Sequence, residues 1–146
     1  MSIAERTVQT SWAGALATGA GTLGHGSSGA LDGLPVTWAA RTETPGGKTS
    51  PEELAAAAHS SCFAMALSLK LGENQTPPQH LDVTATVTLA EVGGLPTITT
   101  SELTVRAQVA DLSAADFVAV VDAAAALCPV SRLFAGAKIS IDAQLA

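Results

Sequence analysis

The segment that most constrains this chain is residues 49–72, TSPEELAAAAHSSCFAMALSLKLG, which turns from polar to almost wholly apolar. Its start combines Ser50 as an N-cap, Pro51 at the first helical position and acidic residues in the first turn. Glu53 stands three residues after Ser50, which completes a capping box. We therefore predict a helix over residues 51–71 that ends at the following glycine. Because this helix is apolar on nearly every side, we expect it to be buried all round.

The chain before this helix, residues 6–40, is rich in glycine and predicts a meander of antiparallel strands. We expect strands at residues 7–12 and 34–39, with turns supplied by the glycines of residues 19–29. The stretch TGAGTLGHGSSG contains neither the GxxxxGK[ST] phosphate loop nor a GxGxxG that opens a helix. A phosphate-binding loop is therefore not expected.

The chain after the helix predicts two strands, a second helix and a closing strand. Residues 81–92 and 97–109 alternate between apolar and polar side chains, and the turn sequence GGLP between them is typical of a hairpin. A second helix is predicted from Ser113, as its N-cap, to about Leu127. Residues 137–146 alternate again as a closing strand. This order of elements indicates an α+β domain.

Composition bounds the size of the fold and the kind of partner. With 146 residues the chain is expected to be one domain, residues 1–146, large enough to bury a core. Hydrophobic residues make up 47% and charged residues only 14%, so we expect subunits to associate. The net charge of −6 argues against binding to nucleic acid or to an anionic membrane surface.

The sequence indicates a cytoplasmic protein. Residues 1–12 lack a basic region followed by an apolar run, so no signal peptide is expected. No apolar stretch reaches the roughly 18–20 residues of a spanning helix without charges or turn residues. Thiols are normally kept reduced in the cytoplasm, so the two cysteines are more often inert or catalytic there than a structural bridge.

Cys62 lies inside the predicted apolar helix, and two interpretations are open for it. Its face of the helix is apolar apart from His59, so burial would raise the pKa of the thiol and leave Cys62 as a small, inert hydrophobe. To react at neutral pH, Cys62 would need a cation from elsewhere in the fold. Arg41, ten residues before Pro51, is the candidate, although it also fits an ordinary surface arginine.

Cys128 precedes a proline in the sequence LCPVSRLF, which predicts a short helical turn. With Pro129 at the first helical position, Cys128 is the N-cap. There the free N–H groups and the positive end of the helix dipole favour a thiolate. Taken alone, the C-P-x-S pattern is a weak indicator of function.

Other chemistries fit these residues less well. His59 and Cys62 have the i, i+3 spacing of a ligand pair, but the other cysteine and histidines are scattered, whereas zinc needs about four ligands. A hydrolase built on His59 and Cys62 would lack an oxyanion hole inside a helix. We therefore expect no metal and interpret His59 as a hydrogen-bonded core or interface residue. Glu53 is explained as a cap, which leaves Glu52 without a local role.

TSPEELAAAAHSSCFAMALS and CPVSRLF together resemble the motifs of the OsmC/Ohr family of thiol-dependent peroxidases, with Cys62 and Cys128 66 residues apart. The resemblance covers nearly the whole chain, and the place of Arg41 after the predicted strand at residues 34–39 resembles the OsmC branch. It implies an α+β, OsmC-like intertwined homodimer, with antiparallel sheets around long buried central helices. Each active site would lie at the dimer interface.

The resemblance also implies roles for four residues. Cys62 would be the peroxidatic cysteine and Cys128 the resolving cysteine, while Arg41 would pair with the Cys62 thiolate and Glu52 would hold Arg41. Organic hydroperoxides, and less well hydrogen peroxide, would be reduced to alcohols. The resemblance implies an external dithiol of the dihydrolipoyl type as reductant, and the sequence contains no motif for a cofactor.

We expect apolar walls from residues such as Phe63, Met65 and Phe134 to favour organic peroxides. Two alternatives to a peroxidase stay open. One is a redox sensor or disulfide exchanger that uses the same thiols without peroxide turnover. The other is a non-enzymatic, small-molecule-binding dimer whose cysteines are buried hydrophobes.

Overall fold

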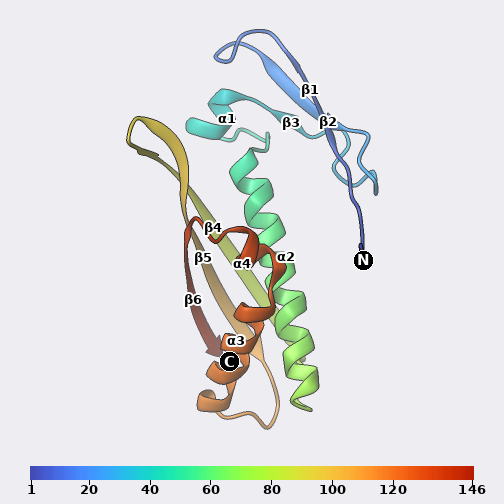
Figure 1. Cartoon of the computed structure of the whole chain (residues 1–146), viewed down its shortest axis with the longest axis vertical. Coiled ribbons are helices and arrows are strands. Elements are labelled where there is room, and N and C mark those ends of the chain that lie inside the picture. The colour runs from blue at the N-terminus through green and yellow to red at the C-terminus, as the bar shows by residue number, and fades with distance from the viewer. The chain divides into compact units, whose positions relative to one another are not determined.

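The computed structural model describes every residue, 1–146, and shows six strands and four helices. The chain forms two compact units, residues 1–54 and residues 55–146, and each holds one three-stranded sheet (Figure 1). The α+β class predicted from the sequence is confirmed. The single domain and the homodimer stay predictions.

The sheet of the first unit has the order β1-β2-β3 and is antiparallel throughout, as predicted. β1 spans Gln9–Ala13, β2 spans Ala20–Gly24 and β3 is only Pro35–Val36. β2 lies inside the glycine-rich stretch in which we expected only turns, so the middle strand of this sheet is the one that the sequence did not predict.

Gly21 explains why a glycine-rich segment forms this middle strand. It pairs with Trp12 of β1 on one side and with Val36 of β3 on the other. A Cβ at this position would lie 2.8 Å from a side-chain carbon of each neighbour. Glycine is therefore present here to let two large side chains approach the backbone, and not to form a turn.

The strand predicted at residues 34–39 is wrong in its second half. The chain leaves β3 after two residues and forms the short helix α1, Trp38–Thr42. Thr37 is its N-cap, and the Thr37 Oγ1 accepts a hydrogen bond of 3.1 Å from the N–H of Ala40. Because this cap and the alanines that follow it favour a helix, Arg41 lies in a helical turn and does not follow a strand directly.

The long helix α2 spans Pro51–Glu73 and begins as predicted, since the N–H of Glu53 donates to the Ser50 Oγ at 3.1 Å. It does not end at Gly72. Gln75 adopts a left-handed φ of 60°, and the N–H of Thr76 bonds the carbonyl of Leu71 at 2.9 Å. This is a Schellman ending with a residue other than glycine at the left-handed position.

Within the single chain, α2 buries only one side. Phe63, Leu67 and Leu71 have no exposed surface, whereas Met65 is 74% and Leu69 is 52% exposed. The prediction of burial all round is therefore wrong for the single chain, because the second unit provides partners for one face of the helix only. By length and hydropathy α2 passes as a spanning helix, but the core helix of a soluble protein passes the same test, so the match carries little weight.

The sheet of the second unit has the order β4-β5-β6. β4, His80–Val92, and β5, Leu95–Gln108, form the predicted hairpin, with Gly93 and Gly94 in its turn at φ values of 60° and 79°. β6, Lys138–Leu145, pairs with β5 in parallel. The expectation of antiparallel sheets is wrong at this edge, because two helices return the chain to the same end of the sheet before β6 begins.

These two helices are α3, Ala114–Leu127, and α4, Pro129–Leu133. Ser113 caps α3 as predicted, with the N–H of Asp116 donating to its Oγ at 3.1 Å. The core of the second unit forms where α2, β5 and α3 meet, and Cys128 belongs to it. Its buried members are Phe63, Ala66, Leu67, Leu71, Leu103, Val105, Ala107, Phe117, Val120, Val121, Ala124 and Cys128.

Candidate active site

Two free thiols meet in the second unit. Cys62 comes from the middle of α2, and Cys128 comes from the junction of α3 and α4, 66 residues further along the chain. Their Sγ atoms are 3.3 Å apart, with Cys62 half-buried and Cys128 buried. Two sulfur atoms in a disulfide are about 2.0 Å apart. A shift of little more than about 1 Å would therefore join these two thiols.

Cys128 occupies the position that its following proline predicts. Pro129 is the first residue of α4 and Cys128 is the N-cap, while the N–H of Cys128 still bonds the carbonyl of Ala124 at 2.9 Å. The Cys128 sulfur makes no cap hydrogen bond of ordinary geometry, but the N–H groups of Val130 and Ser131 favour its thiolate. The junction therefore favours negative charge on Cys128, as the sequence indicated.

The two thiols differ in acidity. Burial raises the pKa of Cys62; the Val130 N–H opposes this effect, and the neighbouring Cys128 raises the pKa further. Burial also acts to raise the pKa of Cys128, but the Ser131 hydroxyl and N–H, together with Cys62 and Val130, outweigh it and lower that pKa. Within the second unit, Cys128 is therefore the more acidic thiol.

His59 is a fully buried residue of α2, and both of its ring nitrogens have partners. Nδ1 lies 2.6 Å from the Ser101 Oγ of β5, and Nε2 lies 2.8 Å from the Ser131 Oγ of α4. The ring of Phe134 packs edge-on against the imidazole, with 5.3 Å between centroids. Burial lowers the pKa of His59, so its ring is neutral at about pH 7. These contacts agree with the interpretation of His59 as a hydrogen-bonded core residue.

Arg41 and Glu52 form an ion pair in the first unit. The Arg41 Nε lies 3.0 and 3.1 Å from the two carboxylate oxygens of Glu52, and Nη2 lies 2.7 Å from Oε1. The guanidinium also lies 5.8 Å from the ring centroid of Trp38. Glu52, and not Glu53, is thus the partner of Arg41, as expected. The contact between Arg41 and Cys62 stays a prediction, because the two residues belong to different units.

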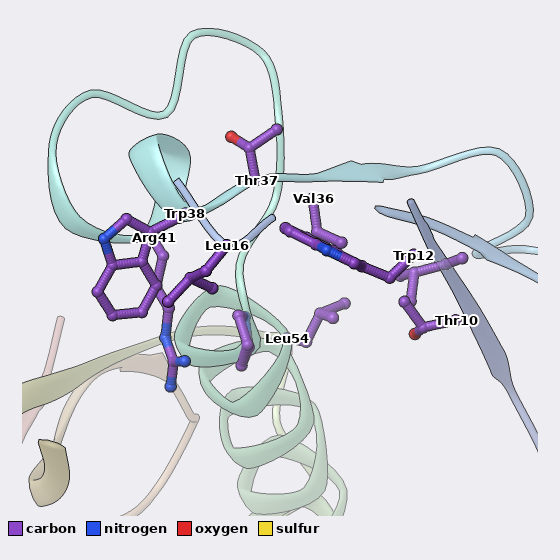
Figure 2. A pocket seen from close by; sticks show the side chains of 10 residues that line it. Thr10, Trp12, Leu16, Val36, Thr37, Trp38, Arg41 and Leu54 are labelled. Atoms are coloured by element: carbon purple, nitrogen blue, oxygen red, sulfur yellow. The ribbon is translucent and has the colours of Figure 1, made fainter. Parts of the chain in front are cut away.

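A pocket of about 390 Å³ opens beside Arg41 in the first unit. In Figure 2, Trp38 and Arg41 lie at one side of this pocket, Trp12 lies at the other, and Leu54 lies between them. The lining is mostly apolar and consists of Thr10, Trp12, Leu16, Leu23, Val36, Thr37, Trp38, Arg41, Pro51 and Leu54. The pocket therefore places one cation against a wall of aromatic and aliphatic side chains.

The residues that we expected to line a substrate pocket are placed differently. Phe63 is part of the core and has no exposed surface, so it lines no open pocket in this chain. Met65 is exposed, and Phe134 packs on His59. The tryptophan-lined pocket and the two serines bonded to His59 were not predicted from the sequence. Only the C-P-x-S pattern pointed to Ser131. No group of three or more His, Cys, Asp or Glu side chains comes together.

Cys62 and Cys128 both fall in a part of the chain that matches a known protein family. Residues 44–143 match the family model described as "OsmC: OsmC-like protein", and the chain belongs to the OsmC family.

Relatives within this family point to the chemistry. The chain is 40% identical to "Peroxiredoxin OsmC" of Escherichia coli K12 over 137 residues, which is 94% of each protein. It is 25% identical to the organic hydroperoxide resistance protein OhrB of Bacillus subtilis, with a TM-score of 0.65, over 96% of this chain and 98% of that one. These relatives support a peroxidase-type function and an oxidoreductase class.

The fold has further matches among solved structures. An organic hydroperoxide resistance protein OsmC from Legionella pneumophila has a TM-score of 0.72 at 19% identity, over 100% of this chain and 99% of that one. At this identity the match concerns the fold alone. It agrees with the two small sheets and the helices described above.

Proposed function

We propose that this chain is a thiol-dependent peroxidase that reduces organic hydroperoxides, and hydrogen peroxide less well, to alcohols. The observation that carries the proposal is the 3.3 Å distance between the sulfur atoms of Cys62 and Cys128, two residues 66 positions apart in the sequence. The names of two relatives, a peroxiredoxin and an organic hydroperoxide resistance protein, support it. The chemistry needs no cofactor besides the two thiols and an external dithiol.

In the first step, the Cys62 thiolate attacks one oxygen of the hydroperoxide. An S–O bond forms and the O–O bond breaks, so the sulfur is oxidised by two electrons to a sulfenic acid while the peroxide is reduced. The alkoxide that leaves takes up a proton and becomes the alcohol. Cys62 has the role of nucleophile because it is the less buried thiol of the pair, and so the one nearer to an incoming substrate.

Cys62 needs help to ionise, because burial raises the pKa of its thiol. We assign this role to Arg41, since an opposite charge within about 4–6 Å can lower a pKa by about 1–3. The contact with Glu52 uses Nε and Nη2 of Arg41 and fixes the plane of the guanidinium. Nη1 is then left to donate to a peroxide oxygen.

In the second step, Cys128 attacks the Cys62 sulfenic acid. The S–S bond forms, the S–O bond breaks, and the hydroxyl group leaves as water with the proton that Cys128 gives up. In the third step an external dithiol, which we propose to be of the dihydrolipoyl type, reduces the disulfide. It takes up the oxidation as its own disulfide and returns both thiols.

The pocket beside Arg41 supports the preference for organic peroxides. Its walls include Trp12, Trp38, Leu16 and Leu54, so they can hold an alkyl or aryl group while the Arg41 guanidinium holds the polar end of the molecule. Hydrogen peroxide has no apolar part to bind there. We therefore expect it to be the poorer substrate.

We further propose that the protein is a cytoplasmic homodimer. Met65 and Leu69 expose apolar surface on α2, and the chain has few charged residues to cover its surface. A second copy would cover this face and complete the site at the interface. Sedimentation of the reduced protein would test the dimer directly.

The decisive experiment is the intact mass of fully reduced protein after one equivalent of cumene hydroperoxide, measured for the natural chain, Cys62→Ser and Cys128→Ser. We expect the natural chain to lose two hydrogens as the disulfide forms. Cys128→Ser should hold a sulfenic or over-oxidised species, and Cys62→Ser should stay unchanged. A natural chain that stays reduced while folded would overturn the proposal.

A second candidate function is a disulfide exchanger or redox sensor, which the lowered pKa of the Cys128 thiol favours. Such a protein would be oxidised by peroxide once and slowly, and a dithiol would not restore repeated consumption. Steady consumption of cumene hydroperoxide with dihydrolipoamide present separates the two functions. Many turnovers per protein molecule support the peroxidase, and a single turnover supports the sensor.

A further inference from the structure

A chain of polar contacts leads from the core of the second unit to the two thiols. It includes two hydrogen bonds, from the Ser101 Oγ to His59 at 2.6 Å and from His59 to the Ser131 Oγ at 2.8 Å. Ser131 is the third residue of α4 and Cys128 is the N-cap of the same helix, so the Ser131 side chain lies in the first turn next to the Cys128 thiol. The sulfurs of Cys128 and Cys62 are 3.3 Å apart. Ser101, His59 and Cys128 have no exposed surface.

The number of available protons allows only two hydrogen-bonding arrangements among Ser101, His59 and Ser131. Neutral His59 has one N–H and one acceptor nitrogen, and each serine hydroxyl has one proton. If Ser101 donates to Nδ1, then Nε2–H donates to the Ser131 Oγ, and the Ser131 proton is free to bond the Cys128 sulfur. In the opposite direction Ser131 spends its proton on Nε2 and can no longer donate to Cys128.

We propose that His59 is a positioning residue for the disulfide-forming step. Held by Ser101, its Nε2–H engages the Ser131 oxygen and turns the Ser131 hydroxyl proton toward the Cys128 sulfur. Cys128 then meets the Cys62 sulfenic acid as a hydrogen-bonded thiolate. This inference rests on the proposed peroxidase function and assigns the residues that prepare its second step.

The chemistry of that step stays balanced. Cys128 loses its proton, its sulfur forms the S–S bond, and the hydroxyl of the Cys62 sulfenic acid leaves with that proton as water. Ser131 and His59 end the step with the protons with which they began. They act by stabilising charge on Cys128 and not by transferring a proton to the product.

The charged side chains around Cys128 do not supply this stabilisation. Those on the neighbouring elements are exposed or paired with one another. Asp116, Asp122, Arg132, Glu102 and Lys138 are exposed, Arg106 pairs with Asp142, and Lys70 pairs with Glu73. The lowered pKa of Cys128 comes from the groups that face its sulfur, among which Ser131 contributes both its hydroxyl and its N–H. Neutral polar groups therefore lower the pKa of Cys128, an effect that a nearby cation has on other acidic thiols.

The first test measures the acidity of Cys128 alone, in the Cys62→Ser background, by titrating the thiolate absorbance. We expect Ser131→Ala to raise the measured pKa of Cys128 by about one, which is a tenfold change in the thiolate fraction. Two His59 variants separate the ring nitrogens. Gln places its amide near Nε2 and keeps the Ser131 contact, whereas Asn places its amide near Nδ1 and loses it.

We therefore expect His59→Asn to raise the Cys128 pKa as Ser131→Ala does, and His59→Gln to raise it by less than half as much. Ser140→Ala is the matched control, because Ser140 is an exposed serine of β6. This titration needs no peroxide turnover. Its outcome is therefore independent of whether the proposed function holds.

The second test follows disulfide formation by quenched-flow mass spectrometry on the two-cysteine protein. With Ser131→Ala, the pH profile of disulfide formation should move upward by about one pH unit. The slowing near pH 7 should be only about threefold, because a more basic thiolate is also a better nucleophile. Formation of the sulfenic acid should change by less than about twofold.

An unchanged Cys128 pKa and an unmoved pH profile in Ser131→Ala would overturn the proposal. A uniform loss of rate without movement of the profile would also overturn it, since that is the result expected of a purely structural serine. If His59→Asn fails to fold, Ser131→Ala decides the question by itself, because Ser131 is only half-buried.

Discussion

The two units of this chain surround their functional side chains in opposite ways, one with a charged partner and the other with neutral groups. In the first unit, Arg41 keeps a full positive charge near the surface and is held by the carboxylate of Glu52. In the second unit, the thiol Cys128 is buried among neutral groups, and the hydroxyl and N–H of Ser131, whose Oγ also contacts His59, lower its pKa. The first unit thus has a cation and no cysteine, whereas the second has two cysteines whose neighbours are neutral.

This difference has a physical cause. A guanidinium cannot give up its proton, so it must stay solvated or paired, and Arg41 is both. A thiol or an imidazole can enter the core in its neutral form and pays little desolvation cost there. The comparison teaches that packing can bring two neutral thiols together in a core, whereas a permanently charged group such as Arg41 stays where it is solvated or paired.

The largest expected effect concerns the stability of the second unit. Phe63→Ala should lower the free energy of unfolding by about 3–5 kcal/mol, because Phe63 has no exposed surface and leaves a cavity. Leu16→Ala, in the first unit, should cost less than about 1 kcal/mol, because Leu16 is 58% exposed. Urea unfolding of both variants measures this difference. Equal losses would mean that Leu16 is buried against another molecule in solution.

The next effect concerns the cation. Arg41→Ala should lower kcat/KM for cumene hydroperoxide by about 100-fold, because it removes the cation that we propose to offset the raised pKa of Cys62. Arg41→Lys should recover only part of this loss, since a lysine cannot contact Glu52 and a peroxide in one plane. Steady-state assays over a range of pH check both. A loss confined to KM, with the pH profile unmoved, would mean that Arg41 binds substrate without activating Cys62.

A smaller effect is expected from the carboxylate that orients Arg41. Glu52→Gln should lower kcat/KM by about 10-fold, since a neutral amide holds the guanidinium less firmly. The matched control is Glu53→Gln on the adjacent residue, which is exposed and whose side chain has no contact with Arg41. The control should retain activity within about twofold. If both variants lose the same activity, the acidic first turn of α2 matters as a whole and the ion pair does not.

The smallest effect is the pH dependence of stability that His59 causes. Burial lowers the pKa of His59 below its unfolded value of about 6.5, so the unfolded chain binds the extra proton first. The contribution of neutral His59 to the free energy of unfolding is fully present above about pH 6.5 and is lost as the pH falls from there toward the folded pKa. Urea unfolding at about pH 7 and about pH 5 should therefore show that the free energy of unfolding decreases less in His59→Gln than in the natural chain. His80→Gln, at an exposed histidine, should show the same decrease as the natural chain.

Much of the fold was readable from local sequence. The caps at Ser50 and Ser113, the GGLP hairpin and the alternating strands were correct, because each depends on residues within a few positions of one another. The strand at residues 34–39 failed because the Thr37 cap starts a helix in its middle. The strand β2 and the parallel pairing of the predicted closing strand β6 escaped prediction, because both depend on neighbours that lie elsewhere in the chain.

By itself, the sequence determined which side chains can react and the local structure around each of them. Cys62 lies within an apolar helix, Cys128 precedes a proline, and Glu52 has no local role because Glu53 is the capping residue. Only the tertiary structure decided that the two sulfurs approach to 3.3 Å and that Ser101, His59 and Ser131 stand behind them. The reason is that a helix or a cap is encoded by neighbours in sequence. The relative acidity of two thiols, in contrast, depends on burial and on hydrogen bonds from residues that only folding brings into contact.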